Sequence, residues 1–444
     1  MSAAPDIAGQ SIAGPNVAGK GLIIAAPSSG AGKTTLTLAL LRLLARQGIN
    51  VRGAKSGPDY IDPKFHEAAS GAPCLNLDAW AMTPGRLRSL AAGEDSALIV
   101  EGAMGLFDGA PPQGKGAVAD LARLFSLPVV LVLDAGRMAG SVAPLVAGFA
   151  RFDSAVRVGA VILNNVGSDR HEAMLRRALA PLGLPVLAAM RRNKALVMPS
   201  RHLGLVQAGE RSDLESFLEA AADALADSLD QEALMALMAP TPQRASLPQT
   251  PPRMIPPAQR IAVARDQAYA FSYPHLLADW HAAGAEVTAF SPLADEAVPS
   301  CDFLYLPGGY PELHAGRLAS NTTFLNSLRK AAQDTVIYGE CGGYMTLGEG
   351  LIDAEGTRHQ MAGLLRLETS FAQRKLHLGY RELSATEGPL QGTWKAHEFH
   401  YATTLKAEGT PLFTAQDAEG NALPDMGLID GSVYGSFGHV IDKA

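Results

Sequence analysis

The chain has 444 residues, of which 47% are hydrophobic and 18% charged, and its formal net charge at pH 7 is −7. This length predicts about two to three domains, and the apolar content excludes disorder as the overall state. The acidic balance argues against a nucleic-acid binder, which needs a basic surface. Three cysteines are too few for a disulfide scaffold, so we expect a reducing, cytoplasmic compartment.

The N-terminus shows no sign of a targeting or membrane segment. Residues 1–20 lack a basic start and a continuous apolar run, so we expect a flexible tail and not a signal peptide. A membrane-spanning helix needs about 20 apolar residues. The longest uncharged candidate, Met138–Ala150, is shorter and contains Pro144. The sequence therefore predicts no membrane partner.

Residues 21–239 alternate short apolar runs with helical patterns, which is typical of a parallel sheet covered by helices. We expect an α/β domain here. The expected strands are Leu22–Ala26, Ala97–Val100, Val129–Leu133 and Val158–Leu163, and the expected helices are Thr34–Gln47, Val118–Phe125, Glu172–Leu182 and a closing helical region over Asp213–Met238.

A proline-rich stretch divides the chain. Residues 240–257 contain seven prolines in 18 residues, which predicts a semi-rigid linker. Residues 258–444 then repeat the α/β pattern as a second domain, and the tail from Leu376 is expected to add antiparallel strands. The expected elements are strands Ile261–Ala264, Val287–Phe290, Phe303–Leu306 and Val336–Tyr338, and the helix Pro274–Ala283.

The first candidate site is a phosphate-binding loop. The strand Leu22–Ala26 runs into Pro27-Ser-Ser-Gly-Ala-Gly-Lys-Thr-Thr35 and then into a helix, which is the proper context of a P-loop, although Pro27 replaces its first glycine. Backbone N–H groups of such a loop, together with the helix N-terminus, bind phosphate oxygens. We expect Lys33 to reach the β- and γ-phosphates of ATP and Thr34 to bind Mg²⁺.

Acidic residues after two neighbouring strands are candidates to complete that site. They occur in Lys55-Ser-Gly-Pro-Asp-Tyr-Ile-Asp62 and in Glu101-Gly-Ala-Met-Gly-Leu-Phe-Asp108. Carboxylates at the carboxyl ends of parallel strands lie where open α/β sheets bind ligands. Glu101 is the first choice as a Mg²⁺ ligand and Asp59 the second, while Asp134 competes for the same role.

The second candidate site is an activated cysteine. Gly339-Glu-Cys-Gly-Gly343 follows an apolar run and forms a G-x-C-x-G elbow, the sharp turn that exposes a nucleophile. We expect a helix N-terminus to lower the pKa of the Cys341 thiol and nearby N–H groups to stabilise an oxyanion. The glycine loop at Gly308 and Gly309 is the expected second donor. His439 is the preferred base, with His397 and His400 as alternatives.

Together the motifs resemble those of the corrinoid a,c-diamide synthases, which act on cobyrinic or hydrogenobyrinic acid. The resemblance spans residues 20–442. It also includes Pro199-Ser-Arg-His-Leu-Gly-Leu-Val206, His397-Glu-Phe-His-Tyr401 and Gly435-Ser-Phe-Gly-His439. It implies a dethiobiotin-synthetase-like P-loop domain with a parallel sheet, followed by a class I glutamine amidotransferase α/β domain. The implied chemistry is ATP- and Mg²⁺-dependent amidation of two acetate carboxylates of a corrinoid polycarboxylate, through acyl phosphates, with ammonia from glutamine.

The resemblance also distributes roles over the candidate residues. Cys341 and His439 would hydrolyse glutamine without the usual glutamate two residues after the histidine, because Ile441 occupies that position. The oligomeric state stays open, a homodimer included. The implied sites are ATP-binding Ser29, Gly30, Ala31, Gly32, Lys33, Thr34, Thr35 and Asn164; metal-binding Thr34, Glu101 and Asp59; oxyanion- or glutamine-binding Gly308, Gly309 and Gly342; and, for the synthetase step, Tyr60, Asp62, Asp108, Arg201 and His202.

Two other classes of protein share part of this pattern. Cobyric acid synthases and nickel-sirohydrochlorin diamide synthases have the same build, but the former lack the Tyr60-Ile-Asp62-Pro form. P-loop switch ATPases of the partitioning type carry a signature lysine five residues before the P-loop lysine, where this chain has Ser28. Of the two corrinoid substrates, the overall resemblance favours the metal-free one, hydrogenobyrinic acid.

Overall fold

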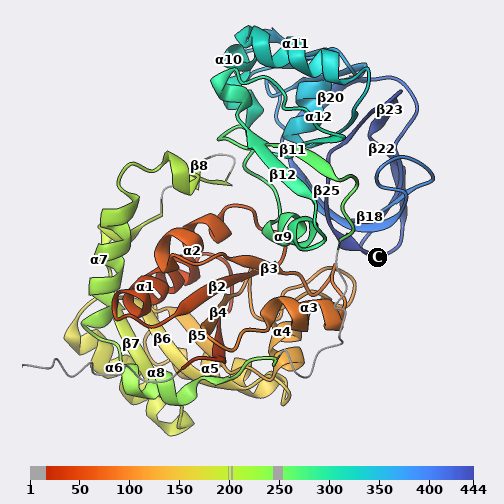
Figure 1. Ribbon diagram of the computed structural model, residues 1–444. Coiled ribbons are helices and arrows are strands. Elements are labelled where there is room, and N and C mark those ends of the chain that lie inside the picture. Colours follow the sequence, from red (N-terminus) through yellow and green to blue (C-terminus); the bar gives the residue numbers. More distant parts are fainter. Residues whose placement is uncertain (1–16, 199, 202–203, 244–253) are drawn as a thin grey trace, which may run out of the picture.

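The computed structural model describes residues 17–198, 200–201, 204–243 and 254–444, in which two α/β bodies follow one another along the chain (Figure 1). Residues 1–16 of the predicted tail lie outside the described residues. Of the rest of that tail, Val17 is buried and Lys20 begins the first strand. The middle of the predicted linker, 244–253, also lies outside them. Its first residue, Pro240, pairs with Lys20, so the domain holds this end of the linker.

The N-terminal body is built on one sheet of seven parallel strands in the order β3-β2-β4-β1-β5-β6-β7. Its central strands are buried on both faces, which explains why they read as continuous apolar runs. A short strand, β10 (Ala239–Pro240), adds antiparallel to β1. The parallel strands are β1 (Lys20–Ala25), β2 (Val51–Ser56), β3 (Leu75–Leu77), β4 (Ala97–Glu101), β5 (Val129–Asp134), β6 (Val158–Val166) and β7 (Val186–Arg191).

Helices cover both faces of this sheet, and separate apolar clusters pack on each side. All four predicted strands and the three single predicted helices of this half are confirmed, although the end of the third is a separate 3₁₀ turn. The helices are α1 (Lys33–Arg46), α2 (Asp62–Ser70), α3 (Pro84–Ala91), α4 (Val118–Phe125), α5 (Val142–Phe152), α6 (Asp169–Leu179), α7 (Leu214–Ala226) and α8 (Gln231–Leu237), with 3₁₀ turns η1 (Ala180–Leu182), η2 (Lys194–Leu196) and η3 (Ala208–Glu210), and a two-stranded hairpin of β8 (Ser200–Arg201) and β9 (Gly204–Leu205).

The C-terminal body begins with a second sheet, whose strand order is β12-β11-β13-β14-β24-β23. Its first five strands are parallel and β23 is antiparallel. Its elements are β11 (Arg260–Ala264), α9 (Pro274–Ala282), β12 (Glu286–Phe290), η5 (Pro292–Ala294), β13 (Phe303–Leu306), η6 (Pro311–His314), α10 (Ala315–Ser320), α11 (Thr322–Ala331), β14 (Val336–Glu340), α12 (Gly342–Leu347), β23 (Leu428–Asp430) and β24 (Val433–Ser436).

Two further sheets follow, and the second of them confirms the prediction of antiparallel strands in the tail from Leu376. One has the order β16-β15-β17-β20, and the other, fully antiparallel, has the order β22-β21-β18-β19-β25. The chain leaves the parallel sheet after β24 and enters the antiparallel sheet at once, which puts His439 at the junction. The strands are β15 (Gly350–Ile352), β16 (Arg358–Gln360), β17 (Leu367–Ser370), β18 (His377–Ala385), β19 (Gly392–His400), β20 (Thr403–Ala407), β21 (Phe413–Asp417), β22 (Ala422–Met426) and β25 (Gly438–Lys443).

Buried polar contacts join the two bodies where α9 meets β3 and α3 (Figure 1). The Arg86 guanidinium on α3 donates to Asp279 on α9 and to Asp442 on β25, with Nε 3.1 Å from Asp442 Oδ2. The Tyr380 hydroxyl donates to Asp78 Oδ2 at 3.0 Å. Because Arg86, Asp78, Asp279 and Asp442 are buried, the two domains meet at a defined interface.

No helix within the described ranges has the length and apolar content that crossing a bilayer requires.

Candidate active sites

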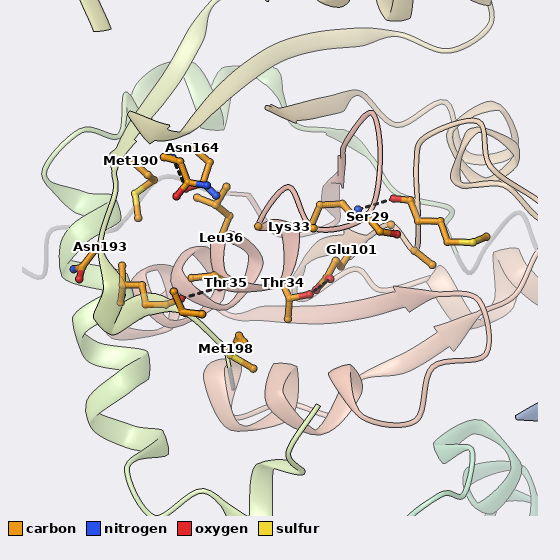
Figure 2. A pocket seen from close by; sticks show the side chains of 18 of the residues that line it. Ser29, Lys33, Thr34, Thr35, Leu36, Glu101, Asn164, Met190, Asn193 and Met198 are labelled. Atoms are coloured by element: carbon orange, nitrogen blue, oxygen red, sulfur yellow. Dashed lines mark hydrogen bonds between the residues drawn. The ribbon is translucent and has the colours of Figure 1, made fainter. Parts of the chain in front are cut away.

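The phosphate-binding loop lies between β1 and α1, at the carboxyl edge of the parallel sheet (Figure 2). Gly30 and Gly32 have φ angles of 80° and 92°, the left-handed region that favours glycine. Gly32 is the N-cap of α1, and no side chain caps the first N–H groups of that helix. These N–H groups are therefore open to an anion, as a phosphate site requires.

Close packing also requires a glycine at position 32. A Cβ atom there would lie 2.1 Å from the Asn164 side-chain nitrogen, which donates to the Ala31 carbonyl at 2.9 Å. Asn164 at the end of β6 therefore holds the back of the loop, and it also lines the pocket in front of the loop. The sequence analysis named Asn164 only as an ATP-binding residue.

Lys33 spans the loop. Its Nζ donates to the carbonyl of Ser28 at 3.1 Å and to that of Met104 at 2.5 Å, so the ammonium group joins the P-loop to the segment after β4. Burial lowers the pKa of Lys33, and the neighbouring Lys55 adds to this effect. The side chain is thus held in place before a phosphate arrives.

Thr34 and Glu101 meet directly, as a shared metal site requires. The Thr34 hydroxyl donates to Glu101 Oε1 at 2.6 Å and lies 3.4 Å from Asp62 Oδ2. Asp59 lines the same pocket, but its Oδ1 accepts from the backbone N–H groups of Ile61 and Asp62. Asp62, which the sequence analysis named for the synthetase step, therefore lies near Thr34. Asp59, which it named as a metal ligand, fixes the start of α2.

The sequence analysis quoted Lys55 without giving it a role. Its buried Nζ donates to both Asp62 and Glu101, at 2.8 Å from Glu101 Oε1. Burial opposes the charge on Lys55, but the two carboxylates outweigh burial and raise its pKa. Burial and the charge of Asp59 raise the pKa of Asp62 to about 7.

A histidine that the sequence did not single out supports Glu101 from behind. His66 Nε2 lies 2.6 Å from Glu101 Oε2, and His66 Nδ1 lies 3.4 Å from the Cys74 thiol. Burial disfavours the His66 cation, but Cys74 and Glu101 outweigh it and raise the pKa of His66 to about 10. Although burial opposes ionisation of Glu101, its cationic neighbours Lys55 and His66 hold the pKa of Glu101 below its ordinary value.

This group of side chains fits a magnesium ion. Hydroxyl and carboxylate oxygens are the ligands that Mg²⁺ prefers. Thr34 and Glu101 supply such oxygens at hydrogen-bond distance from each other, and the buried Asp62 Oδ1 has no hydrogen-bond partner among the described residues. A cation between the loop and these acids would give that oxygen a partner.

The pocket in front of the loop has a volume of about 550 Å³. Its far side is formed by β7 and the following segment, including Met190, Asn193 and Met198 (Figure 2). Thr35 bonds this wall, because its hydroxyl donates to the Leu196 carbonyl at 3.3 Å. The predicted residues brought together around the pocket are Ser29, Gly30, Gly32, Lys33, Thr34, Thr35, Asp59, Glu101 and Asn164.

Other predicted residues have different positions. Asp108 Oδ2 accepts from the Gly105 N–H at 2.9 Å and so closes its own turn. Asp134 accepts from Gly136 and from the Asn165 amide. Neither acid lines the pocket. Arg201 belongs to the short strand β8, and His202 lies outside the described residues.

The cysteine elbow stands at the carboxyl end of β14, as the sequence predicts. Cys341 has φ 46° and ψ −99°, an uncommon combination for a residue with a side chain. Its N–H donates to the Ser436 carbonyl at 2.8 Å, which ties the elbow to β24. A Cβ on Gly343 would lie 1.9 Å from the Leu306 carbonyl oxygen, so the small flanking residue is a steric requirement.

The glycine loop after β13 lies against this elbow. The position of a Cβ on Gly342 would be 3.0 Å from the Gly309 nitrogen, so the two glycines approach closely beside Cys341. Gly309 and Cys341 line one small cavity. The backbone N–H groups of this region are suited to stabilise an oxyanion.

The expectation of a lowered thiol pKa was wrong. Burial, reinforced by the Glu312 carboxylate, raises the pKa of Cys341 above its ordinary value. The helix that begins after the elbow has only six residues, and its dipole does not offset the loss of solvation. Glu312 lines the same cavity, and burial raises its own pKa to about 8. The thiol therefore needs a base to lose its proton.

His439 is fully buried at the edge of this site. Its ring packs against Gly308, where a Cβ would lie 2.2 Å from His439 Cε1. Burial lowers the pKa of His439 to about 3, which keeps the imidazole neutral. Neither ring nitrogen has a hydrogen-bond partner among the described residues. A neutral, unpartnered imidazole is suited to accept a proton.

The two alternative histidines lie on β19. His397 faces His439 in the strand pairing, and burial lowers its pKa to about 4. His400 lines the cavity of Cys341, but its Nε2 is bonded to Glu398 at 3.0 Å. His400 is thus the histidine that lines the cavity of the thiol, and His439 is the one next to the glycine loop.

The loop between β2 and α2 joins the first site to the thiol site. This loop carries Tyr60 between Asp59 and Asp62, and the centroid of the Tyr60 ring is 4.6 Å from that of the His439 ring. The Tyr273 hydroxyl donates to the Tyr60 hydroxyl at 2.9 Å. One loop therefore carries acids of the first site and a contact with the second.

Comparison with known proteins agrees with this division. Residues 22–206 match the family model described as CobQ/CobB/MinD/ParA nucleotide binding domain. Residues 260–444 match the model described as CobB/CobQ-like glutamine amidotransferase domain. Each family model therefore lies within one of the two α/β bodies, and α7 and α8 follow the first match.

Similar proteins extend over nearly the whole chain. A hydrogenobyrinate a,c-diamide synthase of Brucella suis is 56% identical over 95% of this chain and 98% of its own length. The proteins of that name from Brucella anthropi and Rhizobium meliloti are 55% and 54% identical, each over 95% of this chain and 98% and 99% of their own lengths. This chain therefore belongs to the hydrogenobyrinate a,c-diamide synthase family, with a nucleotide-binding domain followed by a glutamine amidotransferase domain.

Proposed function

We propose that this chain, an amidating ligase, converts the a and c acetate carboxylates of hydrogenobyrinic acid to carboxamides, with ATP as the activating substrate and glutamine as the nitrogen donor. The names of its relatives support this substrate, and they favour the metal-free ring over its cobalt-containing form. The observation that carries the proposal is the contact between Tyr60 and His439, because it brings the acid-bearing loop of one site against the other.

The P-loop site activates the carboxylate. A carboxylate resists ammonia because oxide is a poor leaving group, whereas an acyl phosphate releases phosphate readily. Lys33 and the open N–H groups of α1 bind the transferred phosphate. Mg²⁺, held by Thr34, Glu101 and the Asp59 or Asp62 carboxylate, would supply charge neutralisation during the transfer.

The thiol site supplies ammonia. Cys341 attacks the side-chain amide of glutamine after His439 takes the thiol proton, and the proton then passes to the leaving nitrogen. The N–H groups of Gly309 and Gly342 stabilise the oxyanion. Water then hydrolyses the thioester and releases glutamate. The raised pKa of the buried thiol makes this base necessary.

We place this reaction in the cytoplasm, where Cys341 stays reduced. Ammonia must reach the acyl phosphate unprotonated. Aromatic side chains from both domains pack here, with Tyr60 against His439 and with Phe271 and Tyr273 against Tyr60, and they exclude bulk water from the contact between the sites.

The test is conversion of hydrogenobyrinic acid by the purified protein with ATP, Mg²⁺ and glutamine, followed by mass spectrometry. The proposal predicts two carboxamides per macrocycle and no product without ATP. A parallel reaction with cobyrinic acid tests the substrate, and we expect slower conversion. Consumption of ATP and glutamine without amidation of either macrocycle would contradict the proposal.

A further inference from the structure

His439 lacks the acidic partner that a glutamate two residues later would provide. That position is the buried, apolar Ile441, and the next residue, Asp442, is bonded to Arg86 at the domain interface. A catalytic histidine needs an acceptor at one ring nitrogen, because this bond fixes which nitrogen carries the proton. His439 therefore needs another acceptor.

Glu340, the residue before the nucleophile, is the acid next to this imidazole. Its Oε2 lies 3.7 Å from His439 Nδ1, slightly beyond hydrogen-bond distance, and its side chain is 2% exposed. Hydrogen bonds of catalytic groups are often long without substrate. Within the described ranges, no other carboxylate oxygen lies within 4.0 Å of this imidazole.

The carboxylate is held in place from two directions. Its Oε2 accepts from the Tyr305 hydroxyl at 2.6 Å, and its Oε1 accepts from the Val440 N–H at 3.0 Å. Val440 follows His439 in β25, so the bond to Oε1 fixes the backbone that carries the imidazole. A carboxylate oxygen accepts two hydrogen bonds, and Oε2 accepts one from Tyr305, with the Tyr338 hydroxyl as a further neighbour of the carboxylate.

Glu398, a further acid near the thiol, is already engaged. Its carboxylate accepts from Arg381 at 2.8 Å and from His400 at 3.0 Å. These partners direct it towards β18 and its own strand. Glu340 is thus the acid that the fold aims at His439.

We propose that Glu340 is a positioning residue for glutamine hydrolysis, whose carboxylate accepts the Nδ1 proton of His439 and leaves Nε2 free to take the Cys341 proton. This inference rests on the proposed roles of Cys341 and His439. It assigns the third member of this group to the end of β14, directly before the elbow, instead of to β25, the strand of the histidine.

The ionisation of Glu340 gives the inference a signature in pH. Burial raises its pKa to about 7. Below that pH Glu340 loses its negative charge, and the neutral acid is a weaker acceptor for the Nδ1 proton and stabilises an imidazolium less, so glutamine-dependent kcat/KM should fall as pH decreases through 7. His439 itself stays neutral there because its pKa is about 3. The titratable groups that face Glu340 and His439 are Tyr60, Tyr273, Tyr305, Tyr338, Cys341, His397, His400 and Glu398.

The test compares Glu340→Gln with Tyr305→Phe. A glutamine keeps the acceptor for the Val440 N–H but presents an NH₂ group to His439, which forces the Nδ1 atom to accept and places the proton on Nε2. We expect kcat with glutamine to fall by about 100-fold or more, with little change in the KM for glutamine. Tyr305→Phe removes one bond to the same carboxylate and should cost less than about 10-fold.

Activity with ammonium salts is measured in parallel and should be unchanged in both variants. The acid limb near pH 7 should be present in the wild type and absent in Glu340→Gln. Equal losses in the two variants, or an unchanged pH profile in Glu340→Gln, would mean that Glu340 only supports the fold, and would overturn the inference.

Two controls separate this inference from the function on which it rests. If Cys341→Ala and His439→Asn abolish glutamine use while Glu340→Gln retains it, only the role of Glu340 is wrong. If His439→Asn retains glutamine use, the proposed base is wrong. Should Glu340→Gln fail to fold, ¹⁵N-histidine NMR of the wild type decides, because a His439 proton on Nε2 in place of Nδ1 would overturn the inference.

Discussion

Replacing Arg86 with methionine tests how the two domains are held together. Arg86 is 2% exposed and belongs to α3 of the first domain, while its partners Asp279 and Asp442 belong to the second. Methionine keeps most of the side-chain volume but removes the charge. Two carboxylates then stay buried without their cation, although the Met254 N–H still donates to Asp279 at 2.9 Å.

The loss follows from the cost of an unpaired buried charge. Removing one partner of a buried ion pair destabilises a protein by about 3–5 kcal/mol. For a domain of this size each kcal/mol lowers Tm by about 2–4 °C, so we expect a drop of roughly 6–20 °C. We also expect more glutamate per carboxamide formed, because a looser interface would separate Tyr60 from His439 and let ammonia escape.

Differential scanning calorimetry and a paired assay of glutamate and product measure these two effects. The matched control is Arg46→Met, which removes an arginine that joins α1 to Glu219 and Asp223 on the surface of α7. Water and salt screen such exposed pairs, so the control should change Tm little. If Arg86→Met melts within about 2 °C of the wild type, the assigned role of this ion pair at the interface is wrong.

Three further changes test single features of the account. Gly308→Ala places a Cβ 2.2 Å from His439 Cε1 and should abolish glutamine use while ammonium-dependent amidation persists, and equal activity with both donors would contradict that packing. Glu101→Gln, which disrupts the contact with the Thr34 hydroxyl, should abolish amidation with either nitrogen donor but leave glutamine binding intact in calorimetry. Burial lowers the pKa of His275 to about 4. As pH falls below 6.5, the imidazole is therefore protonated in the unfolded chain before it is protonated in the folded one, and the free energy of unfolding should fall by about 3 kcal/mol from pH 6.5 to 4. Denaturant titrations of the wild type and His275→Gln measure this free energy at each pH. The same dependence of the free energy of unfolding on pH in both proteins would refute the prediction.

Local sequence patterns were sufficient for the elements and for the two glycine-rich turns. The strand before the P-loop and the helix after it read directly from an apolar run and a glycine-lysine-threonine sequence. The Cys341 elbow likewise depends on residues that are neighbours in the chain. Such features are predictable because the residues that determine them are a few positions apart.

Partners that meet across the fold were not predictable. His66 supports Glu101 from 35 positions away, and Glu340 reaches His439 across two sheets. Arg86 bonds Asp442 across 356 positions. No periodicity links such residues, since their proximity depends on strand order and on domain docking.

The prediction of a lowered pKa for the Cys341 thiol was wrong for a related reason. The prediction used the helix N-terminus beside Cys341, which is a local feature, and omitted burial and the Glu312 carboxylate, which depend on tertiary packing. Desolvation outweighs a short helix dipole in such a site. Activation of the thiol is therefore expected to depend on His439 and not on the helix N-terminus.

The most direct test of the two-site account is Cys341→Ala assayed with each nitrogen donor in turn. The variant removes only the thiol, and the P-loop site with its Thr34–Glu101 contact stays intact. We predict that amidation with glutamine is lost and that amidation of the same macrocycle with an ammonium salt continues at the wild-type rate. Equal loss with both donors would contradict the assignment of glutamine hydrolysis to Cys341.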